Sequence, residues 1–149
     1  MFSVRPAAPA DATRIAAWQV AMAIESEGLA LDAATVSAGV AGVFEDTSRA
    51  RYWLAEAHGV PVGVVMTVPE WSDWRNGTVL WMHSVYVEPA WRQRGAFRAL
   101  YAHLRSLVEG TPGLVGLRLY VDKTNQRAQR VYEALGMSAE HYHLYEWLP

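Results

Sequence analysis

Two arginines and a glycine stand between a strand-like segment and a helix-like segment, and this arrangement predicts an anion-binding site. Val87 ends the strand-like segment, Arg92, Arg94 and Gly95 follow, and an apolar stripe at helical spacing includes Ala96. The first turn of a helix presents unpaired N–H groups and the positive end of the helix dipole, and a glycine lets a phosphate approach the backbone closely. The segment is neither a P-loop nor a Rossmann dinucleotide-binding fingerprint, because the patterns G-x-x-x-x-G-K-[ST] and G-x-G-x-x-G are both absent. A strand–helix connection with solvated arginines explains this segment alone equally well.

Tyr132 lies in a second segment of interest, residues 125–137, which follows a nearly continuous apolar run. On its own this segment predicts an amphipathic helix, with Gly136 placed to cap its end. A tyrosine in such a helix is more often part of the core than a catalytic group.

Taken together, the two segments resemble the GNAT superfamily of N-acetyltransferases. The first matches a strand ending in V-x-V-x-P followed by [QR]-x-x-G-x-[GA] at the start of a helix, except at Phe97, and the second matches N-x-x-A-x-x-x-Y-x-x-x-G-[FM]. The resemblance extends from Val4 to the end of the chain, and residues 70–77 look like a bacterial subgroup without an assigned substrate. It implies an α/β fold with a central mixed β-sheet flanked by about four helices, in a single domain over residues 1–149.

The resemblance also implies how the cofactor, acetyl-CoA, is held. Its pantetheine arm pairs with the backbone of a strand that splays from the next parallel strand, and its pyrophosphate rests on amides of the following loop and helix start. The implied cofactor-binding residues are Val85, Tyr86, Val87, Gln93, Arg94, Gly95, Ala96, Phe97, Arg98 and Asn125. The family usually has Gly or Ala at the position of Phe97. The Phe97 amide still donates, but its ring must point away from the phosphates.

Acyl transfer to an amine needs a base for the amine proton, a donor for the thioester oxygen and an acid for the leaving thiolate. The resemblance implies an N–H near Val85 as the donor and Tyr132 as the acid, since the ordinary tyrosine pKa of about 10 keeps a phenol protonated. His83 is the predicted base, because period-two alternation places it on one face with Val85 and Val87 and the ordinary histidine pKa is about 6.5. The alternatives are a histidine packed for structural reasons and a water chain from Glu70.

Carboxylates beside tryptophans form the predicted acceptor site, because this combination suits a cationic amine. Glu25 stands near the end of the first predicted helix, and Glu70, Trp71 and Trp74 fall in a polar segment predicted as a loop over residues 70–76. A solvated carboxylate over a core tryptophan explains any single one of these residues more simply, so the group carries the prediction.

The elements that must position these residues follow from periodicity and from turn and capping signals. Asp11 and Asp32 are predicted N-caps, and His58-Gly59 predicts a hairpin turn. The apolar run over 114–121 predicts a strand buried on both faces, parallel to the strand over 78–87. The predicted helices cover 12–27, 33–46, 92–109 and 124–135, and the predicted strands cover 2–5, 51–57, 60–68, 78–87 and 114–121. Residues 137–148 are predicted as a final strand or hairpin.

Composition narrows the class of protein. The 149 residues contain no cysteine and carry a net charge of −2, which excludes cysteine-based metal sites and thiol nucleophiles and disfavours a nucleic-acid partner. No apolar run approaches the roughly 18 residues of a membrane span and no signal-peptide pattern is present, so a cytoplasmic protein without a membrane partner is expected. His141 and His143 would face the same way on a strand, but without a third ligand no metal is predicted. An exposed strand face or an edge that pairs between subunits is expected there, and the resemblance adds a homodimer.

These observations favour one function over two alternatives. The favoured function is an acetyl-CoA-dependent N-acetyltransferase that acetylates a primary amine of a small molecule, an amino acid or a peptide by direct attack in a ternary complex. The first alternative is a GNAT-fold module that binds CoA or a small ligand with little or no turnover. The second is an interaction subunit without a ligand.

Overall fold

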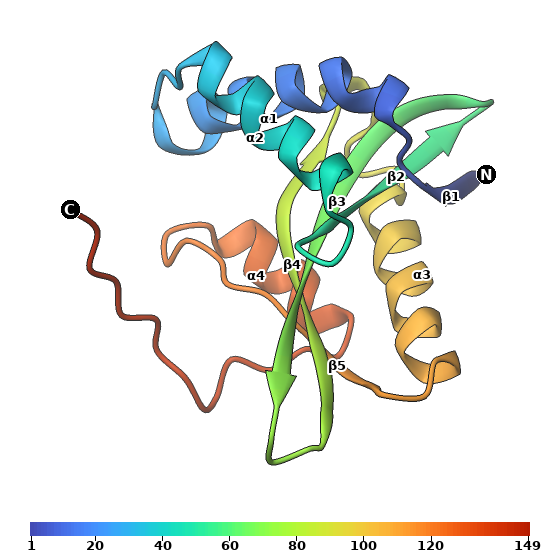
Figure 1. Cartoon of the computed structure of the whole chain (residues 1–149), viewed down its shortest axis with the longest axis vertical. Helices are drawn as coiled ribbons and strands as arrows, with labels where there is room; N and C mark the ends of the chain where they lie inside the picture. The colour runs from blue at the N-terminus through green and yellow to red at the C-terminus, as the bar shows by residue number, and fades with distance from the viewer. The chain divides into compact units, whose positions relative to one another are not determined.

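Five strands form one mixed β-sheet in the computed structural model, which describes residues 1–149 (Figure 1). The strands lie in chain order, with β1 to β4 pairing antiparallel and β5 joining β4 in parallel. Their bounds are β1 Phe2–Pro6, β2 Arg51–Ala57, β3 Val60–Ser72, β4 Gly77–Val87 and β5 Leu114–Arg118. The predicted mixed sheet and the predicted parallel strand–helix–strand unit are confirmed.

Four α-helices accompany the strands: α1 Ala12–Glu27, α2 Ala33–Glu45, α3 Ala96–Gly110 and α4 Gln126–Ala134. Two short 3-10 helices, η1 Pro9–Asp11 and η2 Pro89–Trp91, precede α1 and α3. The chain divides into two compact units. The unit Met1–Arg118 holds the sheet and the first three helices, and the unit Leu119–Pro149 holds α4. No helix combines the length and the apolar character that crossing a membrane requires.

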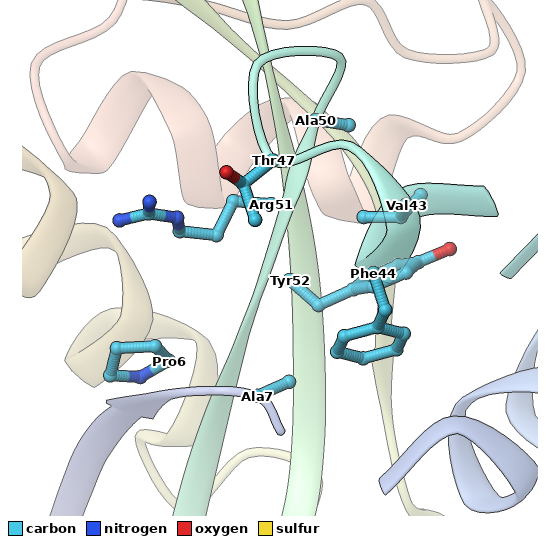
Figure 2. A pocket seen from close by; sticks show the side chains of 8 residues that line it. All are labelled: Pro6, Ala7, Val43, Phe44, Thr47, Ala50, Arg51 and Tyr52. Atoms are coloured by element: carbon cyan, nitrogen blue, oxygen red, sulfur yellow. The ribbon is translucent and has the colours of Figure 1, made fainter. Parts of the chain in front are cut away.

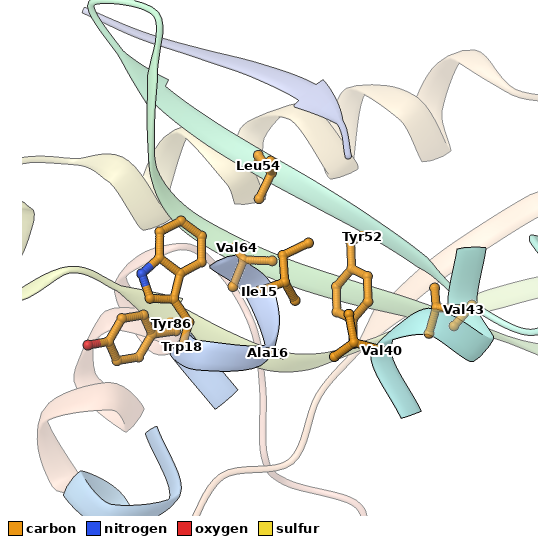
Figure 3. Close-up of a cluster of buried hydrophobic side chains, with 10 residues drawn as sticks. Ile15, Ala16, Trp18, Val40, Val43, Tyr52, Leu54, Val64 and Tyr86 are labelled. Carbon is orange, nitrogen blue, oxygen red and sulfur yellow. The ribbon is translucent and has the colours of Figure 1, made fainter. Parts of the chain in front are cut away.

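Helices pack on both faces of the sheet in the first unit. On one face α1 and α2 cover a buried cluster formed by Ile15, Ala16, Trp18, Val40, Val43, Ala50, Tyr52, Leu54, Val64 and Tyr86 (Figure 3). Side chains alternate along a strand, so Trp53 points to the opposite face, where His103 of α3 packs against it with ring centroids 5.0 Å apart. Leu100 and Leu104 of α3 are fully buried, and burying such a side chain stabilises the fold by about 1.5–3 kcal/mol.

Two local predictions are confirmed. The hairpin between β2 and β3 turns at His58 and Gly59, whose φ angles of +51° and +77° are those of a turn that suits the twist of two antiparallel strands. Asp32 caps α2, because its carboxylate accepts a hydrogen bond from the Thr35 N–H at 2.8 Å.

Asp11 is confirmed as the N-cap residue of α1, but its side chain makes no capping hydrogen bond to that helix. Its carboxylate accepts a hydrogen bond from the Ala8 N–H and pairs with the Arg5 guanidinium, each at 2.8 Å. Arg5 also binds Glu56 of β2 at 2.7 Å. A bond to a guanidinium is stronger than one to a neutral N–H, so the carboxylate joins β1 to η1 instead of capping α1.

The tryptophan-rich segment predicted as a loop over residues 70–76 begins as strand, and that prediction is wrong for its first half. β3 continues to Ser72, with Glu70 paired to Val79 and Trp71 paired to Thr78. Only residues 73–76 turn the chain. The polar composition of this segment misled the loop prediction, because this end of the β3–β4 ribbon is exposed and polar side chains are tolerated there. The backbone hydrogen bonds between β3 and β4 form there with polar side chains as well.

Three other predictions need correction. The helix predicted over 92–109 begins only at Ala96, because Gln93 and Gly95 have φ angles of +63° and +98°, outside the right-handed helical region. The strand predicted over 114–121 ends at Arg118; it is the last strand of the sheet and has no fully buried residue. The helix predicted over 124–135 is confirmed as α4, but the strand or hairpin predicted over 137–148 is not formed. A strand pattern produces a strand only where a neighbouring strand supplies hydrogen bonds.

Candidate active site

A bulge in β4 changes the direction in which its side chains point. His83 pairs with Met66 of β3 and Tyr86 pairs with Val64, so three steps along β4 match two steps along β3. The extra residue coincides with Ser84, whose φ angle is +56°. Bulges of this kind bend a strand and redirect side chains, and they are frequent beside active sites.

The bulge contradicts one prediction about the base. His83 shares a face with Tyr86, the face that α1 and α2 cover. Val87 pairs with Gly63 and points to the other face. The predicted common face of His83, Val85 and Val87 is therefore wrong, because one inserted residue inverts the alternation on which that prediction depended.

Gln19 of α1 holds the bulge in place. Its side chain is buried, with 7% of its surface exposed, and its Nε2 donates to the Ser84 carbonyl at 3.4 Å. A positive φ angle is costly for a residue with a side chain, so the strained Ser84 needs such support. Sequence reasoning missed Gln19, because its partner lies 65 residues away.

β4 has an open backbone edge beyond the end of β5. The ladder between these parallel strands runs from Thr78 paired with Leu114 to Trp81 paired with Arg118. β4 continues to Val87 while paired on its other side with β3. This separation is the one that the family resemblance implied, and the N–H and C=O groups along residues 85–87 suit an extended ligand that pairs like an added strand.

The turn before α3 fits a phosphate ligand. Its left-handed residues, Gln93 and Gly95, bring the chain into the helix, and Gly95 is the N-cap. A glycine has no side chain with which to cap the first turn, so no side chain competes with an anion at the helix start. Arg94 adds positive charge nearby, with its guanidinium carbon 5.6 Å from the Trp91 ring centroid. Phe97, half-buried, lies in the first turn of this helix.

Arg92 connects the turn to β4 and α1, and this use was not predicted. Its Nε donates to the Val87 carbonyl at 2.9 Å, and its Nη2 pairs with Glu25 at 2.6 Å. Its guanidinium carbon lies 5.4 Å from the centroid of the Tyr86 ring. Glu25 is thus already engaged by an arginine, and Tyr86 donates to it at 3.5 Å. Burial, and then the charge of Glu25, raise the pKa of Tyr86, which keeps its hydroxyl protonated.

A second polar cluster surrounds His83 on the same face of the sheet. The His83 ring stacks parallel to Trp81, with centroids 6.0 Å apart. The indole N–H of Trp81 donates to Glu70, and Arg118 pairs with Glu70 at 3.5 Å while its guanidinium lies 5.9 Å from the Trp81 ring. Burial lowers the pKa of His83, so its imidazole is neutral at neutral pH and can accept a proton.

The two predicted tryptophans do not join this cluster as expected. Trp71 follows Glu70 on β3, so alternation turns it to the opposite face, where it is 64% exposed. Trp74 lies in the turn after β3 and is 88% exposed. The aromatic partner of Glu70 is Trp81 instead. The spacing of Trp81 and His83, two residues apart on one strand, was the signal that could have identified this pair.

Asn125 and Tyr132 belong to the second unit. Asn125 is the N-cap of α4, where its side-chain oxygen accepts from the Ala128 N–H at 3.1 Å. Tyr132 lies on the same helix and is half-buried, and burial raises the pKa of its phenol. A phenol with a raised pKa is fully protonated at neutral pH and can act only as a proton donor there.

A separate pocket lies between β1, α2 and β2. It has a volume of about 310 Å³ and is lined by Pro6, Ala7, Val43, Phe44, Thr47, Ala50, Arg51 and Tyr52 (Figure 2). None of the predicted site residues lines it. No group of three or more histidine, aspartate or glutamate side chains is placed to hold a metal ion, and His141 and His143 lie outside any strand.

Comparison with known proteins agrees with this geometry. The model of the acetyltransferase (GNAT) family matches residues 16–137. A mycothiol acetyltransferase of Thermobispora bispora is 38% identical over 94 residues, which cover 60% of this chain but only 30% of the length of that relative. A possible acetyltransferase from Clostridium difficile 630 superposes with a TM-score of 0.92 at 34% identity, covering 100% of this chain and 98% of that chain. A predicted acetyltransferase from Clostridium acetobutylicum, solved with acetyl-CoA, shares the fold with a TM-score of 0.76 at 16% identity, covering 98% and 96%.

The chain therefore belongs to the acetyltransferase (GNAT) family, and the resemblance drawn from its two motifs is confirmed. Membership of this family makes acetyl-CoA the cofactor. The open edge of β4 and the α3 start without a side-chain cap fit that cofactor, because one offers backbone pairing and the other offers an anion site.

Proposed function

We propose that the chain acetylates a primary amine of a small molecule, an amino acid or a peptide by direct attack in a ternary complex. The observation that carries the proposal is the bulged end of β4, where His83 and an open backbone edge lie within a few residues of each other. Bound acetyl-CoA supplies the activated acetyl thioester. The bacterial cytoplasm and a homodimer are the expected location and assembly.

The cofactor is held by backbone groups in this proposal. Residues 85–87 pair with its pantetheine arm, and the amides of residues 93–98 bind its pyrophosphate, with the positive end of α3 adding to the attraction. Asn125 contributes its side-chain N–H groups, because its oxygen already caps α4. An N–H near Val85 stabilises the thioester oxygen as negative charge develops there.

His83 takes the proton from the attacking amine, and Tyr132 gives a proton to the leaving sulfur. The lowered pKa of His83 supports the first role, and the raised pKa of Tyr132 supports the second. Glu70 and Arg118, beside Trp81, form the acceptor side in this proposal. Glu25, Trp71 and Trp74 remain acceptor-binding proposals, although Glu25 would first have to exchange its bond with Arg92.

The test is CoA thiol release from acetyl-CoA over a panel of amines, with the variants His83→Gln and Tyr132→Phe. We expect His83→Gln to remove the acidic limb of the pH–rate profile and Tyr132→Phe to lower kcat more than acetyl-CoA affinity. Glu45→Gln, an exposed change at the end of α2, is the control and should leave both unchanged. A limb that survives in His83→Gln shows that His83 is not the base, and an unchanged kcat in Tyr132→Phe removes the acid role.

Phe97 supports a second candidate function, a GNAT-fold module that binds CoA without turnover. A phenylalanine stands in the first turn of α3 where the family usually has glycine or alanine. Binding of acetyl-CoA in a thermal-shift titration, without thiol release on any amine, would favour this function over the first.

A further inference from the structure

Arg92 occupies groups that both substrates need in the proposed function, on which this inference rests. Its Nε donates to the Val87 carbonyl at 2.9 Å, and its Nη2 pairs with Glu25 at 2.6 Å. Residues 85–87 are proposed to pair with the pantetheine arm, and Glu25 is proposed to bind the acceptor. One arginine side chain therefore contacts the cofactor edge and an acceptor-binding residue at once.

The Val87 carbonyl lies on the open edge of β4. The N–H of Glu88 donates to the Val62 carbonyl at 2.9 Å, so the backbone groups of Glu88 point towards β3. In an antiparallel pair, residues whose backbone groups bond across the pair alternate with residues whose groups point away. Val87, opposite Gly63, is of the second kind, and its carbonyl points to the edge that β5 leaves open. Arg92 thus covers a backbone acceptor on that edge.

The bond between Arg92 and Glu25 is of a kind that exchanges readily. Their side chains are 40% and 42% exposed, and ion pairs as exposed as this contribute little to stability. A guanidinium binds a phosphate more strongly, through parallel charge-assisted hydrogen bonds. Gln93, the next residue, begins the backbone stretch proposed for the pyrophosphate. Arg92 therefore has a better partner beside it as soon as that site is filled.

The place that the Arg92 guanidinium fills is suited to another cation. Its guanidinium carbon lies 5.4 Å from the centroid of the Tyr86 ring, and the Tyr86 hydroxyl donates to Glu25 at 3.5 Å. A carboxylate beside an aromatic ring attracts a cation through its charge, and the ring adds a cation–π interaction. Glu25 pairs with no other arginine or lysine, so its carboxylate is left without a cation when Arg92 leaves.

We propose that the acceptor carries a positively charged group that takes the place of the Arg92 guanidinium between Glu25 and Tyr86 once acetyl-CoA is bound. In the free chain Arg92 fills this place. On cofactor binding, Arg92 gives up the Val87 carbonyl and turns to the pyrophosphate, and Glu25 becomes available. Each substrate then strengthens the binding of the other, because coupling between two binding sites is reciprocal.

The first test is a double-mutant cycle in which titration calorimetry measures the affinity for free CoA. Glu25→Gln removes the carboxylate that holds Arg92, so we expect CoA to bind about 2- to 5-fold more tightly. In the Arg92→Gln background the same change should have no effect, because no guanidinium remains to be released. An unchanged affinity in Glu25→Gln, or an equal gain in both backgrounds, overturns the proposal.

Glu27→Gln is the matched control for the loss of one negative charge. Glu27 is exposed on the last turn of α1, two positions from Glu25, and forms no ion pair. The control should leave the affinity for CoA unchanged. A gain equal to that of Glu25→Gln would show a general effect of charge and would overturn the exchange of Arg92.

The second test uses methylguanidinium as the probe, because it reproduces the group that leaves. NMR of the Tyr86 ring protons follows its binding. We expect the probe to bind several-fold more tightly to the CoA-saturated chain, and to Arg92→Gln without CoA, than to the free chain. Glu25→Gln saturated with CoA should lose this binding. Equal binding with and without CoA, or binding that survives Glu25→Gln, overturns the proposal.

The two tests separate this inference from the proposed function, because neither measures turnover. Thiol release from acetyl-CoA on an amine, without coupling in the cycle, overturns the exchange of Arg92 alone. Coupling in the cycle, without thiol release on any amine, contradicts the proposed function and leaves the exchange of Arg92 supported.

Discussion

Gly95 is the position at which the cofactor site can be tested with the smallest change. Its φ angle is +98°, and an added Cβ would meet its nearest neighbour, an atom of Phe2, only at 3.9 Å. Gly95→Ala therefore causes no clash, and its effect is confined to backbone conformation. A left-handed conformation costs about 1–2 kcal/mol for a residue with a side chain.

The loop before α3 is exposed, so it can relax locally when this cost is imposed. The free protein then adopts another loop conformation, and the cost reappears when acetyl-CoA requires the original one. An energy of about 1–2 kcal/mol corresponds to a loss of affinity of about 5- to 30-fold. We expect this loss for acetyl-CoA and for free CoA alike, because both carry the pyrophosphate.

Titration calorimetry with both ligands measures the loss, and Gly113→Ala is the matched control. Gly113 has a φ angle of +90° and no atom within 4 Å of an added Cβ, but it lies in the turn before β5. The control imposes the same backbone cost away from the α3 start and should leave affinity unchanged. Equal affinities in the two variants would refute the assignment of the pyrophosphate to the α3 loop.

Three further predictions concern titration and stability. Trp81→Ala should raise the pKa of His83 towards its ordinary value, because burial lowers it, whereas Trp81→Phe should change it less; an NMR titration of the ring protons measures this, and equal pKa values in all three proteins would contradict it. Asp11→Asn should cost about 1.5–3 kcal/mol of unfolding free energy at pH 7. The Arg5 hydrogen bond lowers the pKa of Asp11 below the ordinary value of about 3.9. The stabilisation by the charged carboxylate is therefore present above about pH 4 and is lost as the pH falls through the folded-state pKa. Urea unfolding should show the unfolding free energies of the variant and the parent converging in acid. His103→Phe should keep or raise the melting temperature by relieving about 1 kcal/mol, since the buried Nε2 of His103 has no hydrogen-bond partner; a large fall would refute this.

Most of the fold was predictable because its signals are local. Helical spacing and the Asp32 cap predicted α2, and the turn signal at His58-Gly59 predicted the β2–β3 hairpin. The limits of β3 and β5 were not predictable, since a strand extends as far as its neighbour supplies hydrogen bonds, and that depends on residues distant in sequence.

The candidate site was predictable only where local sequence signals mark its residues. His83 and the α3 loop were predicted as site elements because a spacing along the strand marks the first and a motif marks the second. The bulge at Ser84 reversed the expected orientation of His83 relative to Val87, and only the register with β3 shows it. The engagement of Glu25 by Arg92 joins residues 67 positions apart, so no local pattern could predict it.

Mapping acetyl-CoA onto the backbone by amide NMR tests the central claim most directly. The account predicts the largest shift changes at residues 85–87 and 93–98, along the open edge of β4 and at the start of α3. Shift changes confined to the pocket between β1, α2 and β2 (Figure 2), or no change at saturating acetyl-CoA, would contradict it.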